Sequence, residues 1–368
     1  MTDRGPVGDL DRAFWKGRKV FLTGHTGFKG SWLCLWLDAL GAEVTGYALE
    51  PPTRPSLFEQ AGVAATVRSI TADIRDLERL VAAVGECRPE VVIHMAAQSV
   101  VKRGYADPVE TYSSNVMGTV HLFEAVRRLG TACSVVNVTS DKCYAHRASG
   151  GGYREDEPMG GPDPYANSKG CAELVTTAYR HSYFPPDGGS GGAGVALASA
   201  RAGNAIGGGD WTPDQLIPDL IRAFAAGGSC LIRSPDAVRP WQFVLEPLRG
   251  YLMLAEALAK RGQAFASGWN FGPPDNDVQP VAWIADRLVD GWGGTASWTR
   301  DRAAHPPEAA VLRLDAAKAA RQLGWRSALS LAQALEWIVE WYRGWNRGDD
   351  MGRLTRSQID RYERLLAP

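Results

Sequence analysis

The chain has 368 residues, which predicts two domains or one large one, and its 40 Lys and Arg residues balance its 41 Asp and Glu residues. This balance, and the lack of any apolar run near the ~18 residues of a membrane span, argue against nucleic-acid binding, a signal peptide and a membrane segment. The six cysteines are scattered without a Cys-x-x-Cys pair, which favours a cytoplasmic protein with reduced thiols and no metal site.

Strands and helical patterns alternate through the first half of the chain. Apolar runs predict strands over 19–23, 43–49, 67–72, 90–94 and 134–139, and apolar residues at helical spacing predict helices over 32–40, 77–85 and 110–129. Such alternation implies βαβ units and a parallel sheet covered on both faces. The expected fold is therefore α/β, with a doubly wound parallel sheet of the Rossmann type.

The second half of the chain is less regular. A helix over 164–183 and a strand over 195–201 continue the pattern. Short helices punctuated by Pro and Gly then suggest a smaller α/β C-terminal domain; they are expected over 218–226, 247–261, 281–290, 316–323 and 331–343. We expect a Rossmann domain over 17–200 with interleaved later segments, a second domain mainly over 201–345, and terminal extensions over 1–16 and 346–368.

The apolar stripes of helices 110–129 and 164–183 allow two interpretations. They could pack into the four-helix bundle of a homodimer, or they could only cover their own sheet. The sequence leaves both open, as it leaves open whether dimers pair into tetramers.

Gly24, Gly27 and Gly30 form a GxxGxxG pattern between the first strand and an amphipathic helix. In that context the first glycine permits a tight turn, the second lets the backbone approach a pyrophosphate, and the third allows close packing of helix on strand. The phosphate charge would then lie at the helix N-terminus. The alternative is a glycine turn that binds no ligand.

Residues after the second and third strands bear on which dinucleotide binds. A carboxylate at the end of the second strand typically holds NAD, whereas an arginine there accommodates NADP. Ala48 stands where that carboxylate is expected, while Glu50 and Arg54 follow it, so the pattern is mixed and we favour NAD over NADP. Asp73 and Ile74 end the third strand and suit an adenine contact, although Asp73 could instead cap the next helix.

Tyr165 and Lys169 lie four residues apart on a predicted helix, and therefore on one face. A lysine charge and a cationic nicotinamide would lower the pKa of Tyr165 from ~10 and make it a base toward an alcohol that loses hydride. Ser140, Asp141 and Lys142 follow a strand at the ligand-binding edge and suggest alcohol orientation with acid–base work. The alternative for the first motif is that Tyr165 and Lys169 only lie on an exposed helix surface. The alternative for the second is that residues 140–142 are only the polar exit from a strand into a loop.

These motifs resemble the extended short-chain dehydrogenase/reductase family over about residues 17–343, and more narrowly its CDP-glucose 4,6-dehydratases. The matching stretches are 25–33 (HTGFKGSWL), 52–58 (PTRPSLF), 94–98 (HMAAQ), 140–144 (SDKCY), 165–173 (YANSKGCAE), 201–211 (RAGNAIGGGDW) and 239–247 (RPWQFVLEP). The dTDP-glucose dehydratases carry Thr-Asp-Glu where this chain has Ser140-Asp141-Lys142. The lysine therefore points to the cytidine enzymes.

The resemblance implies conversion of CDP-glucose to a CDP-4-keto-6-deoxy sugar and water, by oxidation at C4, elimination across C5 and C6, and return of hydride to C6. Tyr165 would take the 4-hydroxyl proton, Ser140 would bind the 4-oxygen, and Lys169 would bind the nicotinamide ribose. Asp141 would be the acid for the departing 6-hydroxyl. Lys142 would be the base at C5, which needs a neutral amine, and the alternative that Asp141 serves both steps stays open.

The resemblance also implies binding residues. The NAD contacts are Gly24, Gly27, Phe28, Lys29, Gly30, Asp73, Ile74, Ala96, Ala97, Thr139, Tyr165 and Lys169. The nucleotide-sugar contacts are Gln98, Asn204, Leu216 with its neighbours in 215–218, and Arg239. Asn270, Glu308 and Asp315 are weaker candidates that could equally be cap or turn residues, and Cys143 and Cys171 are expected to pack.

Other functions share parts of this pattern. A nucleotide-sugar 4-epimerase or another nucleoside-diphosphohexose dehydratase would use the same loop and Tyr165, although an epimerase needs no Asp141–Lys142 pair. An NAD-binding regulatory protein would keep the loop but not the catalytic motifs, which are complete here. We therefore expect an enzyme of deoxysugar biosynthesis, with a nucleotide sugar as its partner.

Overall fold

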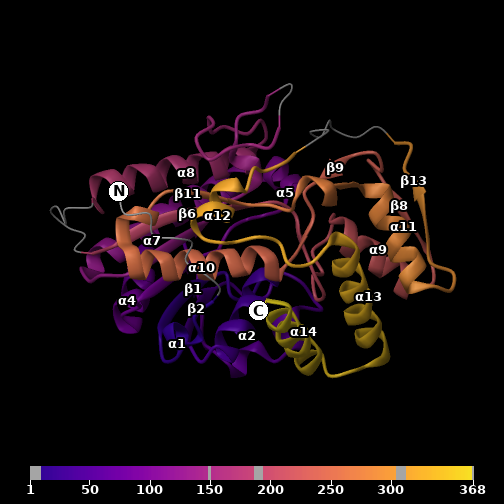
Figure 1. Cartoon of the computed structure of the whole chain (residues 1–368), viewed down its shortest axis with the longest axis horizontal. Coiled ribbons are helices and arrows are strands. Elements are labelled where there is room, and N and C mark those ends of the chain that lie inside the picture. The colour runs from indigo at the N-terminus through magenta and orange to yellow at the C-terminus, as the bar shows by residue number, and fades with distance from the viewer. Residues whose placement is uncertain (1–9, 148–150, 186–193, 304–311, 367–368) are drawn as a thin grey trace.

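A parallel β-sheet forms the centre of the larger lobe (Figure 1). The computed structural model describes residues 10–147, 151–185, 194–303 and 312–366, and in these seven strands follow the order β11-β6-β5-β4-β1-β2-β3, with every neighbouring pair parallel. The strands are β1 (Lys19–Thr23), β2 (Glu43–Ala48), β3 (Arg68–Thr71), β4 (Val91–His94), β5 (Ser134–Val138), β6 (Ala196–Ala202) and β11 (Gly268–Phe271). Every residue of β4, β5 and β6 is buried, as in strands covered on both faces. The predicted doubly wound parallel sheet is confirmed.

Helices cover both faces of this sheet. Side chains alternate between the two faces of a strand, so Val20 and Leu22 of β1 belong to one apolar core and Phe21 belongs to the other. The first core includes α1 (Arg12–Trp15), α2 (Phe28–Ala39), α10 (Leu245–Arg261) and α14 (Met351–Leu366), and the second includes α4 (Leu77–Cys87), α7 (Gly118–Leu129) and α8 (Pro164–Ser182). No helix in the described part of the chain is long and apolar enough to cross a membrane.

The strand order reverses between β1 and β4. From β1 the chain continues to β2 and β3 on one side, and then crosses to the other side of β1 to form β4, β5 and β6. The connections after β1 and β4 therefore leave the sheet in opposite directions and open a crevice at its carboxyl edge. Open α/β sheets bind their ligands at this point.

A smaller lobe is built mainly from sequence after β6. Its described strands pair β7 (Ala205–Ile206) with β10 (Gln242–Phe243), β8 (Ser229–Ile232) with β13 (Ser297–Arg300), and β9 (Val238–Arg239) with β12 (Gln279–Pro280). The helices α9 (Leu216–Ala225), α11 (Val281–Trp292) and α13 (Leu331–Arg347) lie with them, at the end of the molecule remote from α4 and α7 (Figure 1). In contrast, α10, α12 (Ala317–Gln322) and β11 return to the main sheet, so later segments are interleaved with the first lobe.

Three segments differ from the expectations, and the first is β11, because no strand was expected over Gly268–Phe271. The helix expected over 110–129 starts earlier, as α6 (Pro108–Tyr112), and passes through a π-helical turn at Ser113–Met117 before α7. The segment 346–368, expected as an extension, contains α14, whose Tyr362 hydroxyl donates a hydrogen bond to the buried Glu246 at 2.8 Å. The remaining short helices are α3 (Leu57–Gln60) and α5 (Val101–Ala106).

Candidate active site

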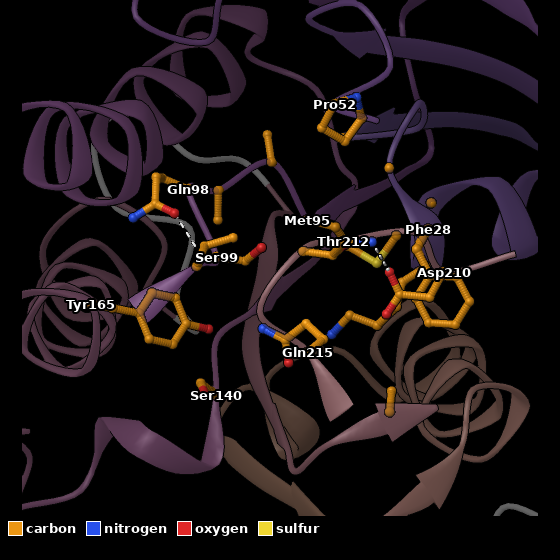
Figure 2. Close-up of a pocket in the computed structure, with 18 of the residues that line it drawn as sticks. Phe28, Pro52, Met95, Gln98, Ser99, Ser140, Tyr165, Asp210, Thr212 and Gln215 are labelled. Atoms are coloured by element: carbon orange, nitrogen blue, oxygen red, sulfur yellow. Dashed lines mark hydrogen bonds between the residues drawn. The ribbon is translucent and has the colours of Figure 1, made fainter. Parts of the chain in front are cut away.

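A cavity of about 730 Å³ occupies the crevice at the carboxyl edge of the sheet. Segments after β1, β2, β3, β4 and β5 line it from the larger lobe, and residues between Ala202 and Pro218 line it from the smaller lobe. In Figure 2, Tyr165 directs its hydroxyl into the cavity near Ser140, and Phe28 lies on the opposite side. A ligand in this cavity would therefore contact both lobes.

The glycine loop after β1 has the geometry that the sequence predicts. Gly24 has a φ of +76°, and a Cβ at this residue would lie 2.8 Å from the backbone nitrogen of Ala96. A Cβ on Gly30 would lie 2.1 Å from the carbonyl oxygen of Gly24, so a side chain there would separate the helix from the loop. Because α2 begins at Phe28, directly after Gly27, the positive end of its dipole meets the cavity.

The ends of β2 and β3 form one wall of the cavity, with Ala48, Leu49, Glu50, Asp73 and Ile74 among its lining residues. Arg75 holds the Asp73 carboxylate with hydrogen bonds of 2.6 and 3.0 Å, and these bonds lower the pKa of Asp73. Asp76, rather than Asp73, caps α4 by accepting from the backbone nitrogen of Arg79. Asp73 is thus an ionised acceptor at the wall of the cavity.

Tyr165 and Lys169 lie on the first turns of α8, which starts at Pro164 after its cap residue Asp163. Both side chains are buried and line the cavity, and Lys169 Nζ donates to the carbonyl oxygen of Val138 over 3.3 Å. Burial lowers the pKa of Lys169 to about 8.

The expected lowering of the Tyr165 pKa depends on a bound, positively charged nicotinamide beside Lys169, and it stays a prediction. Burial raises this pKa, and the hydrogen bond with Ser140 opposes the rise only in part. The physical reason is that a phenolate removed from water loses more hydration than one hydrogen bond restores. The nearby carboxylate of Asp141 raises the pKa of Tyr165 further.

Ser140, Asp141 and Lys142 leave β5 in a short 3-10 turn over Asp141–Cys143. The Ser140 hydroxyl caps this turn: it accepts from the backbone nitrogen of Lys142 at 3.2 Å and donates to Asp141 Oδ1 at 3.0 Å. Asp141 is 3% exposed, its Oδ2 has no hydrogen-bond partner, and burial raises its pKa. Lys142 Nζ lies 6.0 Å from the ring centre of Tyr165. A phenol, a carboxyl group and an amine therefore meet in one cavity.

Lys29 and Asp210 bring further charges into the cavity. The Lys29 ammonium interacts electrostatically with Asp141, Asp210 and Lys169. Burial lowers the pKa of Lys29 and raises that of Asp210, whose Oδ1 accepts a hydrogen bond of 3.0 Å from the backbone nitrogen of Thr212. The sequence analysis did not single out Asp210, although the stretch over 201–211 contains it and was the available signal.

Apart from the weaker candidates, all but one of the site residues expected from the sequence line this cavity. Gln98, Asn204 and Leu216 lie on its wall together with all the expected NAD contacts and the catalytic set. Arg239 lies outside the lining, buried on β9, where its charge acts on Asp141 and lowers the pKa of that carboxyl against the effect of burial.

The weaker candidates have structural partners. The Asn270 side chain accepts from the Tyr144 hydroxyl at 2.7 Å and donates to the carbonyl oxygen of Tyr153 at 2.8 Å. Asp315 caps the backbone nitrogen of Ala317 at 2.8 Å. Glu308 lies outside the described residues, Cys143 is fully buried, and Cys171 is partly buried.

Comparison with known proteins agrees with this geometry. The family model described as the NAD dependent epimerase/dehydratase family matches residues 20–267. A CDP-glucose 4,6-dehydratase of Salmonella typhimurium is 53% identical over 353 residues, which cover 96% of this chain and 98% of that protein. A UDP-glucose 4-epimerase of Mycolicibacterium smegmatis is 31% identical over 230 residues, which cover 57% of this chain and 73% of that protein.

A solved structure extends the similarity to three dimensions. The dTDP-glucose 4,6-dehydratase DesIV of Streptomyces venezuelae, solved with NAD and TYD bound, aligns with a TM-score of 0.72 at 27% identity. The alignment covers 89% of this chain and 98% of that chain, so both lobes are shared.

Proposed function

The chain belongs to the NAD dependent epimerase/dehydratase family, and we propose that it acts as a CDP-glucose 4,6-dehydratase. The reaction converts CDP-D-glucose to CDP-4-keto-6-deoxy-D-glucose and water. One observation carries the proposal: Asp141 and Lys142 share a cavity with Tyr165. Elimination of water needs an acid and a base beyond the tyrosine that oxidation uses, and the 53% identity to the Salmonella enzyme supports the cytidine substrate.

NAD is the cofactor of the proposed reaction, and the cavity fits it. The backbone around Gly24 and Gly30 is packed too closely for a Cβ at either residue. Such a tight glycine turn before a helix is the cradle that a pyrophosphate requires. Asp73 and Ile74 would bind the adenosine end, and Lys169 the nicotinamide ribose. Bound NAD⁺ would supply a hydride acceptor for oxidation at C4 and, in its reduced form, a hydride donor for C6.

Tyr165 and Ser140 serve the oxidation of the sugar. Tyr165 as phenolate takes the proton of the 4-hydroxyl, and Ser140 donates a hydrogen bond to the 4-oxygen. In the loaded site, the Lys169 ammonium and the positive charge of the cofactor would together offset the rise in the Tyr165 pKa that burial causes. The cavity thus makes the phenol a base only when the site is loaded.

Asp141 and Lys142 serve the elimination. The 4-ketone makes the C5 proton acidic, and a base removes it while Asp141 gives its own proton to the 6-hydroxyl, which leaves as water. Burial raises the pKa of Asp141, which favours the protonated form that this role needs. Lys142 is the proposed base, and the alternative in which Asp141 serves both steps is decided by the variants described in the Discussion.

The smaller lobe, mainly residues 201–345, is the proposed nucleotide-sugar domain. Asn204 and Leu216 line the cavity on that side, and Gln98 lines it from the segment after β4. Arg239 contributes positive charge near Asp141, which suits a substrate that carries a diphosphate.

We further propose a homodimer formed through α6 and α8. Among the described residues, exposed large apolar side chains gather on and around these helices: Tyr105, Val109, Tyr112, Met117, Leu174 and Tyr183. Val109 is 77% exposed and Leu174 is 61% exposed. Meanwhile α7 buries Leu122, Phe123 and Val126 against the sheet, so this helical layer covers the sheet and still leaves an outer apolar face. A second copy would bury that face.

We also propose that the protein works in the cytoplasm. All six of its cysteines are unpaired, and five of them are buried. Reducing conditions preserve such thiols.

Incubation with CDP-glucose and NAD⁺ in D₂O tests the proposed function. We expect a product that has lost one water, carries a 4-ketone, and has one deuterium at C5 from reprotonation. Formation of CDP-galactose would identify an epimerase, and faster turnover of dTDP-glucose would identify another dehydratase. Unchanged CDP-glucose in the presence of bound NAD would identify a binding protein.

A further inference from the structure

Glu173 carries a buried carboxylate that the proposed mechanism does not use. It lies on α8 one turn beyond Lys169, so it continues the stripe of the two catalytic residues on this helix. Its oxygens accept four hydrogen bonds, from Thr139 Oγ1 at 2.5 Å, Ser199 Oγ at 2.7 Å, and Arg201 Nε and Nη2 at 2.9 and 2.8 Å. The side chains of Glu173 and Arg201 are only 3% and 5% exposed.

Arg201 connects this carboxylate to the far end of the catalytic segment 139–144. Its Nη1 donates to the Tyr144 hydroxyl oxygen at 2.7 Å. That hydroxyl donates in turn to Oδ1 of Asn270 at 2.7 Å, and the Tyr144 ring stacks on Tyr153 with ring centres 4.8 Å apart. The segment is therefore held at its start, through Thr139, and at its end, through Tyr144.

We propose that Glu173 and Arg201 form a positioning clamp that fixes the segment 139–144 against α8, so that Asp141 and its neighbours face Tyr165. The proposal rests on the proposed function, because it concerns the same reaction. Reacting groups need placement within about 0.5 Å, and a displacement of about 1 Å can lower a rate about 100-fold. The clamp provides this placement because Glu173 and Tyr165 belong to one helix.

Stabilisation alone does not account for this arrangement. Burial of two charges removes their hydration, and an apolar pair of similar volume often gives equal or greater stability. Charged hydrogen bonds are short and directional, so they define the position of a neighbouring segment more sharply than apolar contacts do. A buried ion pair that contacts both ends of the catalytic segment is therefore suited to positioning.

Two single-hydroxyl deletions separate positioning from stability. Tyr144→Phe removes the hydroxyl at the segment end of the clamp and keeps the ring that stacks on Tyr153, and Tyr144 does not line the cavity. Ser199→Ala is the matched control, because it removes one buried hydroxyl from Glu173 on the side that does not contact the segment. Thr139→Val cuts the other end of the clamp and is the second variant, should Tyr144→Phe not fold.

We expect Tyr144→Phe to lower kcat roughly 10- to 100-fold with KM for CDP-glucose unchanged, and Ser199→Ala to keep wild-type kcat. Hydrogen exchange of the 139–144 amides, measured without substrate, should quicken in Tyr144→Phe and stay at the wild-type rate in Ser199→Ala. A folded Tyr144→Phe variant with wild-type kcat and wild-type exchange rates would overturn the clamp. Equal losses of kcat in Tyr144→Phe and Ser199→Ala, in proportion to their losses in Tm, would overturn it as well. If the wild-type protein does not convert CDP-glucose, the proposed function fails, while the exchange comparison still decides the clamp.

Discussion

Replacement of Asp141 by Asn tests the division of labour in the cavity. The change keeps the size of the side chain and its contact with Ser140, and it removes the proton that the 6-hydroxyl must receive. General acid–base groups contribute about 10²- to 10⁴-fold to a rate, which corresponds to about 3–5 kcal/mol of barrier. We expect oxidation at C4 to continue and elimination to stall, so that reduced cofactor accumulates and absorbs near ~340 nm.

The pH dependence follows from the burial of Asp141. Burial raises its pKa in the folded protein, so the folded state holds this proton more tightly than the unfolded state does. The wild-type elimination rate should fall as pH rises through the raised pKa, because only the protonated acid can act. The same shift makes the ionised carboxyl destabilising above the ~3.9 of an unfolded Asp, so Asp141→Asn should raise Tm at neutral pH, with the gain vanishing in acid.

The assay is stopped-flow absorbance after mixing with CDP-glucose, with Lys142→Met measured beside it. If Lys142 is the base at C5, both variants stall after oxidation and both trap reduced cofactor. If Asp141 serves both steps, Asp141→Asn alone traps it and Lys142→Met loses rate modestly. An Asp141→Asn enzyme with wild-type product formation, or one whose Tm falls at neutral pH, would refute the reasoning.

Three further variants test other parts of the site and the surface. Tyr165→Phe should lower kcat by about 10²-fold or more while NAD binding by fluorescence stays unchanged, and wild-type turnover would remove the assigned role. Gly30→Ala should abolish NAD binding in calorimetry, because its Cβ would lie 2.1 Å from Gly24 O, whereas the control Gly85→Ala meets nothing within 4 Å on α4 and should stabilise by about 1 kcal/mol. Leu174→Glu should give a monomer in light scattering, and an unchanged mass would contradict a dimer through α8.

The sequence predicted six of the seven strands of the central sheet because those strands carry local signals, and it missed β11. Residues 19–23 and 134–138 are apolar runs in which every residue, apart from Lys19, is buried in the structure. Glycine positions were equally readable, since Gly24 needs a positive φ and Gly30 leaves no room for a side chain. Such constraints act within a few residues, so one sequence is enough to find them.

Contacts between distant segments were not readable in the same way. Glu173 is the third member of the stripe that contains Tyr165 and Lys169, which was a signal, but its partner Arg201 lies on another strand. The position of α14 depends on contacts such as Tyr362 with Glu246, which are separated by more than a hundred residues. Such contacts are set by how the layers pack, and the pattern of one segment does not contain them.

Burial also shifts the pKa values of the charged groups that line the cavity. The amines of Lys29 and Lys169 lose their charge more readily inside the cavity, and the carboxyl groups of Asp141 and Asp210 keep their protons more firmly. The pKa values of the carboxyl groups therefore rise and those of the amines fall, so that both kinds of group come closer to neutral pH. Groups with such pKa values can both donate and accept protons under these conditions. Asp and Lys side chains on an exposed loop would stay fully ionised, so the chemistry proposed for this site requires the burial that the crevice provides as much as it requires these side chains.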